Sequence, residues 1–387
     1  MKTAVFDSRW ILEKPSGIGV YALELARRLP SLLPGWRFVF LAEDEPGRKR
    51  LVAELTATAL AGGNILPVGY GPLSVKNQLR LPGLLRELGA DLYHAPNYML
   101  PFRAFRKGGG APVRCIATIH DVIPLVVPGY APHSRTARMK PVYKWCLRQA
   151  ALRSDALFTV SERSKADILR ALALPKDAAA RIRAVHNGVD PAFNAHGRSP
   201  VRAREDPSER ILLYVGRCDP YKNVPMLVEA FAAARAAAPF PMKLIVAGPR
   251  DPRYPEAEQR AKALGVGSAV QFAGPLRFRE LAELYRRADL LVHPSRYEGF
   301  GLQIAEAFAS GLPVICSDGG AAPEVAGVAA RVVPLAGGAP AFAEAILSLL
   351  SDSAELARLR EAGLRRAASF TWERAAREIA AAYDEER

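Results

Sequence analysis

The sequence is poor in cysteine and contains no long apolar run. Its four cysteines, Cys115, Cys146, Cys218 and Cys316, are scattered and form no Cys-x-x-Cys pair. A disulfide scaffold or a structural zinc site is therefore not expected. No apolar stretch is long enough to cross a bilayer, and the first ten residues lack the apolar segment of a secretion signal. These absences predict a cytoplasmic protein.

Acidic residues are scarce in the first half of the chain, which carries most of the positive charge. Residues 1–190 contain 28 Lys and Arg against 15 Asp and Glu, whereas residues 191–387 contain 25 against 24. The formal net charge of +14 is thus +13 in the first half and +1 in the second. This asymmetry favours an anionic partner such as a phospholipid surface, a phosphorylated acceptor or nucleic acid. The alternative is a solubilising surface in an arginine-rich proteome.

A length of 387 residues favours two domains, and the pattern of apolar runs agrees with this. In the first half, short apolar runs alternate with helical patterns; the runs are 3–7, 37–43, 90–96, 113–121 and 155–161. The second half repeats the alternation, with runs at 211–216, 243–248, 269–274, 289–295 and 312–318. Strands and helices in alternation predict an α/β fold with two Rossmann-like, doubly wound parallel sheets.

A segment rich in Gly, Pro, Asn and charge, residues 186–209, separates the two halves. We expect an N-terminal domain at 1–188, a linker at 189–209, a C-terminal domain at 210–370 and a terminal segment at 371–387. Ligands in open α/β sheets bind beyond the carboxyl ends of the strands. Candidate functional residues should therefore directly follow strands.

Two acidic residues follow a predicted strand, in the stretch HPSRYEGFGLQIAEAFASGLPVICSD at 293–318. Glu298 lies in the turn after a predicted strand, and Glu306 lies about one turn inside the helix that follows. Each acid could accept hydrogen bonds from hydroxyl groups of a ligand. Alternatively, Glu298 only ends a turn and Glu306 is a solvated helix residue.

The start of this helix has the features of an anion site. Its glycines let the backbone approach a ligand closely, and the amides of Phe300, Gly301 and Leu302 are expected to point outward at the positive helix end. This arrangement suits a phosphate. With an acid on either side, it suggests a diphosphate that carries a sugar at each end.

Two basic residues follow the predicted strand 211–216, namely Arg217 and Lys222. A guanidinium and an ammonium group are suited to stabilising a leaving diphosphate. The alternative is that they are ordinary surface charges. Their replacement by alanine is expected to reduce catalysis far more than folding.

These features resemble the retaining glycosyltransferases of family 4, which have the GT-B fold. The resemblance covers nearly the whole chain and is strongest from 211 to 326. The family's E-x7-E motif matches Glu298–Glu306, and its Gly-Arg with a following Lys matches Gly216, Arg217 and Lys222. The resemblance implies an N-terminal acceptor-binding domain and a C-terminal nucleotide-sugar-binding domain that face each other across a cleft. It also implies that 371–387 is a closing helix that packs back on the N-terminal domain.

The resemblance also implies roles for individual residues. Glu306 would hold the nucleotide ribose, and Glu298 the transferred sugar. Arg217 and Lys222 would neutralise the diphosphate. The donor site implied in this way comprises Arg217, Lys222, Glu298, Phe300, Gly301, Leu302 and Glu306.

In the first half, the resemblance covers the SGIG loop and the TIHD strand end. It implies that Gly17 and Gly19 approach the donor and that His120 lies near the reacting sugar. On the residues alone, the favoured alternative is that His120 satisfies backbone groups at a strand end, with Asp121 as its partner.

The sequence contains no Asp-x-Asp motif, which chelates metal in the other major glycosyltransferase fold, and no His-Glu-x-x-His zinc motif. We therefore expect transfer without a divalent metal or other cofactor, with Arg217 and Lys222 in place of the metal. Retention of configuration, with the leaving phosphate helping to deprotonate the acceptor, is implied by the resemblance.

The donor implied by the resemblance is a nucleotide-diphosphate sugar, with GDP-mannose as the first candidate and UDP-glucose or UDP-N-acetylglucosamine open. The acceptor is expected to be a glycan or a lipid-linked acceptor in cell-surface polysaccharide biosynthesis. The alternatives are a sugar-nucleotide epimerase of the same fold and a basic nucleic-acid-binding protein. Neither zinc-finger spacing nor an aromatic RNA-binding strand supports the latter.

A basic helical pattern at 134–154 suggests where a membrane could be contacted. It combines two aromatics, Tyr143 and Trp145, with six cations: Arg135, Arg138, Lys140, Lys144, Arg148 and Arg153. Such a helix can rest on the anionic inner face of a membrane or meet a lipid diphosphate. The alternative is a solvated helix whose aromatics pack inward.

Overall fold

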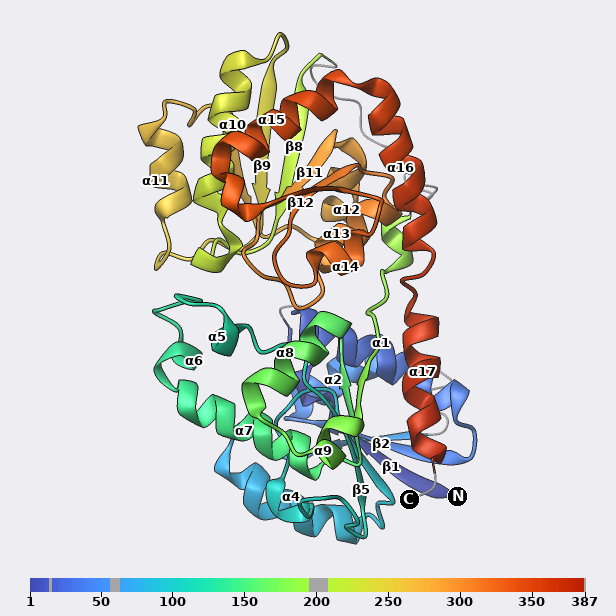
Figure 1. Cartoon of the computed structure of the whole chain (residues 1–387). Helices are drawn as coiled ribbons and strands as arrows, with labels where there is room; N and C mark the ends of the chain where they lie inside the picture. The colour runs from blue at the N-terminus through green and yellow to red at the C-terminus, as the bar shows by residue number, and fades with distance from the viewer. Residues whose placement is uncertain (14–15, 56–62, 195–207, 386–387) are drawn as a thin grey trace. The chain divides into compact units, whose positions relative to one another are not determined.

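A computed structural model of the protein describes residues 1–13, 16–55, 63–194 and 208–385. These residues form two α/β units, each built on one parallel sheet (Figure 1). The first unit comprises Met1–Leu125, Met139–Gly188 and Trp372–Arg387, and the second comprises Val126–Arg138 and Val189–Thr371.

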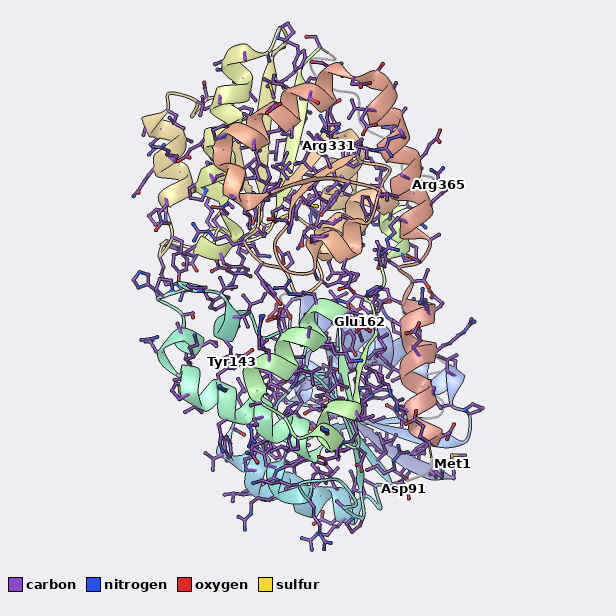
Figure 2. All side chains as sticks on the ribbon, in the orientation of Figure 1. Met1, Asp91, Tyr143, Glu162, Arg331 and Arg365 are labelled. Carbon is purple, nitrogen blue, oxygen red and sulfur yellow. The ribbon has the colours of Figure 1, made fainter. Side chains whose placement is uncertain are left out.

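The sheet of the first unit has seven strands in the order β3-β2-β1-β4-β5-β6-β7. The strands are β1 (Lys2–Phe6), β2 (Trp36–Ala42), β3 (Gly63–Pro67), β4 (Leu92–Ala95), β5 (Arg114–Thr118), β6 (Ala156–Thr159) and β7 (Ile182–Ala184). Asp91, labelled in Figure 2, lies just before β4. Its carboxylate accepts a 2.7 Å hydrogen bond from the Thr3 N–H and so ties β4 to β1. The edge strands β3 and β7 were not among the expected runs.

The helices of this unit are α1 (Gly17–Leu32), α2 (Glu45–Glu54), α4 (Val75–Glu87), α7 (Lys140–Arg153), α8 (Glu162–Leu172), α9 (Lys176–Ala180) and α17 (Trp372–Asp384), with 3-10 turns η1 (Ser8–Trp10) and η2 (Phe102–Ala104). The helix α17 contacts α1. Its Trp372, Ile379 and Tyr383 are buried in the same apolar core as Leu25. The end of the chain therefore completes the core of the first unit.

The sheet of the second unit has six parallel strands in the order β10-β9-β8-β11-β12-β13. They are β8 (Arg210–Val215), β9 (Met242–Ala247), β10 (Val270–Gly274), β11 (Leu290–His293), β12 (Val314–Ser317) and β13 (Arg331–Val333). The first five overlap the expected runs, and the short edge strand β13 was not expected. The central strands are buried on both faces, as their continuous apolar sequences predict.

The helices of the second unit are α6 (Arg135–Arg138), α10 (Val224–Ala237), α11 (Glu256–Ala263), α12 (Phe278–Arg287), α13 (Leu302–Ala309), α14 (Ala322–Ala326), α15 (Gly338–Ser351) and α16 (Ser353–Ala367). Three 3-10 turns, η3 (Pro191–Phe193), η4 (Pro220–Lys222) and η5 (Leu335–Gly337), complete it. The short helix α5 (Ile123–Val126) spans the boundary between the units.

The observed units differ from the expected domains in two places. Val126–Arg138 groups with the second unit, where the His133 N–H donates a 3.1 Å hydrogen bond to the Tyr254 hydroxyl. The start of the expected linker also belongs to this unit, because Phe193 is buried against Tyr285 at a ring distance of 5.4 Å. Residues 195–207 of the linker lie outside the described residues.

Within the described ranges, no helix combines the length and the apolar character that crossing a membrane requires.

Candidate active site

The candidate site is built by two loops that leave neighbouring strands of the second sheet. The strands β8 and β11 pair with each other, but the chain continues from β8 toward β9 and from β11 toward β12 on the opposite side. Ligands bind at such switch points in open α/β sheets. The loops are joined by hydrogen bonds from the Arg296 N–H to the Tyr221 carbonyl at 2.8 Å and from the Asn223 amide to the Pro294 carbonyl at 3.3 Å.

Lys222 and Glu298 form an ion pair between these loops. The ammonium nitrogen of Lys222 donates to both carboxylate oxygens of Glu298, at 2.7 and 2.9 Å. His293, at the end of β11, donates from Nε2 to one of the same oxygens at 2.7 Å. Burial favours the neutral acid, yet the charge of Lys222 and the hydrogen bonds from Lys222 and His293 hold the pKa of Glu298 well below its usual range. The carboxylate is thus fixed in its ionised form.

The loop after β12 packs against the backbone of Glu298. The Ala321 N–H donates to the Glu298 carbonyl at 2.9 Å. A Cβ atom on Gly320 would lie 2.4 Å from that carbonyl oxygen and 2.5 Å from the Glu298 nitrogen. Only glycine allows the two loops to approach this closely. Gly320 also has a φ of +63°, which disfavours side chains.

Gly301 is the N-cap of α13, with a left-handed φ of +95°. Leu302 is the first helical residue, and the first amides of a helix lack intrahelical acceptors. Phe300 precedes them and is buried, with its ring 5.5 Å from that of Phe370. The predicted strand, turn and helix are therefore present, with Glu298 in the turn and Glu306 one helical turn inside α13.

Glu306 is not a solvated helix residue. One of its carboxylate oxygens accepts a 2.7 Å hydrogen bond from the Tyr285 hydroxyl of α12. Burial, with a smaller contribution from the charge of Asp190, raises the pKa of Glu306 to about 7. Among the described residues it has no ion-pair partner. Its remaining hydrogen-bonding capacity is available for a ligand that donates hydroxyl groups.

Arg217 lies on the same loop as Lys222 but differs from it in exposure. Its side chain is 51% exposed, and its Nε donates to the buried carboxylate of Asp219 at 2.7 Å. The side chain of Lys222 is 11% exposed. The expectation that either residue could be removed at little cost to folding therefore needs correction for Lys222, because its loss would leave Glu298 buried without its cation.

The remaining predicted residues belong to the first unit. Gly17 begins α1, and the Gly19 N–H is capped by the Ser16 hydroxyl at 3.0 Å. A Cβ atom on Gly19 would lie 3.1 Å from the Trp10 carbonyl oxygen.

His120 has a backbone partner in the first unit. Its Nε2 lies 2.9 Å from the Pro96 carbonyl oxygen, and burial lowers its pKa to about 4. Since a carbonyl only accepts, Nε2 carries the hydrogen and Nδ1 is left as an acceptor. The nearby Asp121 carboxylate accepts a hydrogen bond from the Ile123 N–H at 3.0 Å.

Family models cover both halves of the chain. Residues 15–193 match the model described as Glycosyltransferase Family 4, and residues 198–366 match that of Glycosyl transferases group 1. A D-inositol 3-phosphate glycosyltransferase 1 of Catenulispora acidiphila is 30% identical over 95% of this chain and 90% of its own. The chain belongs to glycosyltransferase family 4.

A second relative and a solved structure are also similar to this glycosyltransferase over nearly its whole length. O-antigen chain mannosyltransferase B of Escherichia coli is 28% identical, with 98% of both chains covered. Anabaena Alr3699/HepE, whose structure was solved in complex with UDP and glucose, has a TM-score of 0.71 at 18% identity, with 99% of each chain covered. The fold is therefore of the GT-B type, as expected.

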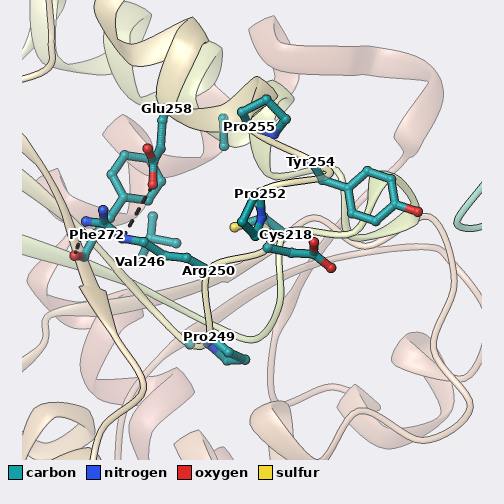
Figure 3. A pocket seen from close by; sticks show the side chains of 12 residues that line it. Cys218, Val246, Pro249, Arg250, Pro252, Tyr254, Pro255, Glu258 and Phe272 are labelled. Carbon is teal, nitrogen blue, oxygen red and sulfur yellow. Dashed lines mark hydrogen bonds and ion pairs between the residues drawn. The ribbon is translucent and has the colours of Figure 1, made fainter. Parts of the chain in front are cut away.

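A pocket of about 230 Å³ opens next to the Arg217 loop of the glycosyltransferase, at the ends of β8, β9 and β10 (Figure 3). Cys218, Asp251 and Tyr254 contribute to its wall, and Arg250 pairs with Glu258 across 3.4 Å. None of the predicted site residues lines this pocket. It adjoins the candidate site without being part of it.

Sequence reasoning missed three supporting residues of the glycosyltransferase site, namely His293, Tyr285 and Gly320. His293 ends an apolar strand, and this position directly before the acid loop was the available signal. Tyr285 is 21 residues from its partner Glu306, and nothing in the sequence indicates that contact. In the described part of the chain, no three His, Cys, Asp or Glu side chains are grouped as metal ligands.

Proposed function

We propose that this glycosyltransferase moves a hexose, with mannose from GDP-mannose as the first candidate, to a glycan or lipid-linked acceptor in cell-surface polysaccharide biosynthesis. The observation that carries the proposal is the Lys222–Glu298 pair at the switch between β8 and β11, on a loop shared with Arg217. Mannose is supported by the similarity to mannosyltransferase B over nearly the whole chain.

In the proposed reaction, the bond between the anomeric carbon and the diphosphate oxygen breaks while the acceptor oxygen bonds to that carbon on the same face. The electron pair of the broken bond leaves with the diphosphate, and the acceptor proton passes to a phosphate oxygen. The anomeric configuration is retained. Atoms and charge balance without any other reactant.

The leaving diphosphate would be stabilised by Arg217 and Lys222, so we propose that no divalent metal is required. Arg217 is exposed enough to meet a ligand and is held by Asp219. Lys222 is held by Glu298, so a diphosphate would share or replace this contact. Fixed cations of this kind require little reorganisation as charge develops.

Glu298 would accept hydrogen bonds from hydroxyl groups of the transferred sugar, and Glu306 from the ribose. Both acids have suitable surroundings, because Glu298 is held ionised and Glu306 has no cation among its described partners. Donor contacts by Gly17 and Gly19, and a place for His120 beside the reacting sugar, are proposals taken from the resemblance.

The acceptor side of the proposal includes a peripheral contact between the basic first half and the inner face of an anionic membrane, in a cytoplasmic protein. The charge distribution supports this part. A lipid-linked acceptor would place the reaction near such a surface.

The proposal is tested by incubating the full chain with GDP-mannose, UDP-glucose or UDP-N-acetylglucosamine and a lipid-linked or oligosaccharide acceptor, with and without a chelator. We expect transfer from one donor, unchanged by chelation, and an α-linked product by NMR from an α-linked donor. Inversion or loss of transfer on chelation would contradict the mechanism.

A donor-only incubation separates the alternatives. Conversion of the donor to its epimer would favour an epimerase, whereas slow hydrolysis fits a transferase. DNA binding without any response to nucleotide sugars would favour a nucleic-acid-binding protein.

A further inference from the structure

Two helices of the first unit, α4 and α7, present exposed apolar side chains beside basic ones. Of the thirteen large apolar side chains exposed in the described part of the chain, six lie on these helices or within two residues of their first turns. Exposed apolar groups that cluster in this way mark interaction surfaces.

Both helices follow the same pattern. On α4, the apolar pair Val75 and Leu79 is 74% and 61% exposed, and the basic pair Lys76 and Arg80 follows one residue behind it. Residues four apart share one face of a helix, so each pair forms a short stripe. An apolar stripe thus runs next to a basic stripe.

On α7, the apolar pair is Val142 and Trp145, which are 50% and 53% exposed. The exposed basic pair is Lys140 and Lys144. Tyr143, labelled in Figure 2, stands on the same helix, but its ring packs edge-on against that of Tyr98, with 5.4 Å between the ring centres. The two aromatics noted in the sequence therefore differ, and only Trp145 is exposed.

Both helices contact the turn η2, and Figure 1 shows them in the same part of the first unit. The Phe102 N–H of this turn donates to the Gln78 side chain of α4 at 2.9 Å. The Phe102 ring lies edge-on to that of Trp145 of α7 at 5.4 Å. The two helices are therefore linked through η2, and we call the exposed stripes of α4 and α7 together the two-helix face.

The two-helix face is bordered mainly by positive charge. Residues 73–87, 97–113 and 139–153 contain ten Lys or Arg and one acid, Glu87, at the end of α4. Within the described residues, none of these ten forms an ion pair. Elsewhere on the molecule, exposed arginines such as Arg365 and Arg358 have carboxylate partners. A surface with ten cations and a single acid is suited to an anionic partner.

From these observations we propose that the two-helix face docks on the surface of an anionic lipid bilayer. The apolar pairs and Trp145 would enter the headgroup region, where tryptophan is favoured, while the lysines and arginines contact lipid phosphates. A nucleic acid would use the cations but not the aliphatic side chains. The inference rests on the proposed membrane contact, adds α4 to the expected basic helix and names the inserted residues.

The test uses the full chain and vesicles of phosphatidylcholine with or without phosphatidylglycerol. We expect binding to the anionic vesicles only, weakened by salt. The double variant Lys140→Glu with Lys144→Glu should weaken binding more than about tenfold, because each basic residue contributes to attraction near the surface. The matched control, Lys262→Glu with Arg365→Glu, has the same net charge change in the second unit and should alter binding less than about twofold.

Trp145 provides a second readout, because Trp10, Trp36 and Trp372 are less exposed. Its emission should shift to the blue with anionic vesicles, and Trp145→Phe should remove the shift. Val75→Ser with Leu79→Ser should weaken vesicle binding while Val328→Ser with Leu264→Ser does not.

Three results would overturn the inference: no binding to anionic vesicles, equal loss in the charge-matched control, or binding of DNA but not vesicles through the same lysines. Transfer to a water-soluble acceptor reports the proposed catalytic function separately. A chain that transfers sugar but ignores vesicles would refute the docking surface alone, and one that docks without transferring would refute the catalytic proposal alone.

Discussion

The ammonium group of Lys222 lies within hydrogen-bond distance of both carboxylate oxygens of Glu298, although the two residues are 76 positions apart in the sequence. The pair joins the loops after β8 and β11. It gives Lys222 a structural role in addition to its proposed contact with the donor diphosphate.

Lys222→Ala is expected to reduce both stability and transfer. Removing one partner of a buried ion pair costs about 3–5 kcal/mol, since the other charge is left uncompensated. The double variant Lys222→Ala with Glu298→Gln should recover much of this stability and still fail to transfer sugar. Thermal unfolding and single-turnover transfer measure the two effects. Equal Tm values for the wild type and Lys222→Ala would show that the pair contributes nothing to folding.

Arg217→Ala should separate catalysis from folding more cleanly. Its guanidinium is half exposed, so we expect a smaller loss of Tm than in Lys222→Ala. Transfer should fall by about 10²–10³, as when one fixed donor to a developing charge is removed. Arg217→Lys keeps the charge but not the planar contact with Asp219. Its transfer rate should lie between those of the wild type and Arg217→Ala. Full activity of Arg217→Ala would contradict its assigned role.

Glu306 should make stability depend on pH in an unusual direction. Its pKa rises from 4.5 to about 7 on folding, so between these values the folded chain holds a proton that the unfolded chain has lost. The contribution of Glu306 to the free energy of unfolding should therefore be greatest below about pH 4.5 and should be lost as the pH rises toward 7. Glu306→Gln should lose this contribution, as measured by denaturant unfolding at several pH values.

The same residue predicts a pH effect on nucleotide binding. An ionised carboxylate accepts ribose hydroxyl groups better than a neutral one, so affinity for the free nucleoside diphosphate should weaken below about pH 7. Calorimetry with the wild type and with Glu306→Gln measures this. A variant that binds as tightly as the wild type at pH 8 would remove Glu306 from the donor site.

Gly320→Ala should disturb the site without touching any charged group. The new methyl group would overlap the backbone of Glu298 at 2.4 Å and displace the acid loop. Gly265→Ala is the control, because Gly265 has a similar φ of +67° but no atom near its Cβ position. Transfer should fall at least about tenfold more in Gly320→Ala, since small displacements of catalytic groups have large kinetic costs. Similar losses in both variants would assign the effect to backbone strain alone.

The central strands could be predicted because each is a continuous apolar run, such as ILLYVG for β8. The three missed strands, β3, β7 and β13, are all sheet edges, and the latter two have three residues each. Edge strands are paired on one side only and need few apolar residues, so RVV and IRA give little signal.

In the candidate site too, the features that are local in sequence were predicted, and the contacts between distant residues were not. The acid loop, the cap at Gly301 and the basic loop are local in sequence, and all were predicted. The pairing of Lys222 with Glu298, the contact of Tyr285 with Glu306 and the packing of Gly320 depend on which strands become neighbours. A single sequence does not reveal that order.

The docking of α17 on α1 has a consequence for biosynthesis. Trp372 and Tyr383 fill the core shared by β1, β2 and α1, although the ribosome makes these elements several hundred residues earlier. The first unit cannot close its core until almost all of the second has been synthesised. Folding of the first unit is therefore completed only after the second unit has been synthesised. A nascent chain that stalls before residue 372 would leave the α1 surface that α17 covers exposed to chaperones.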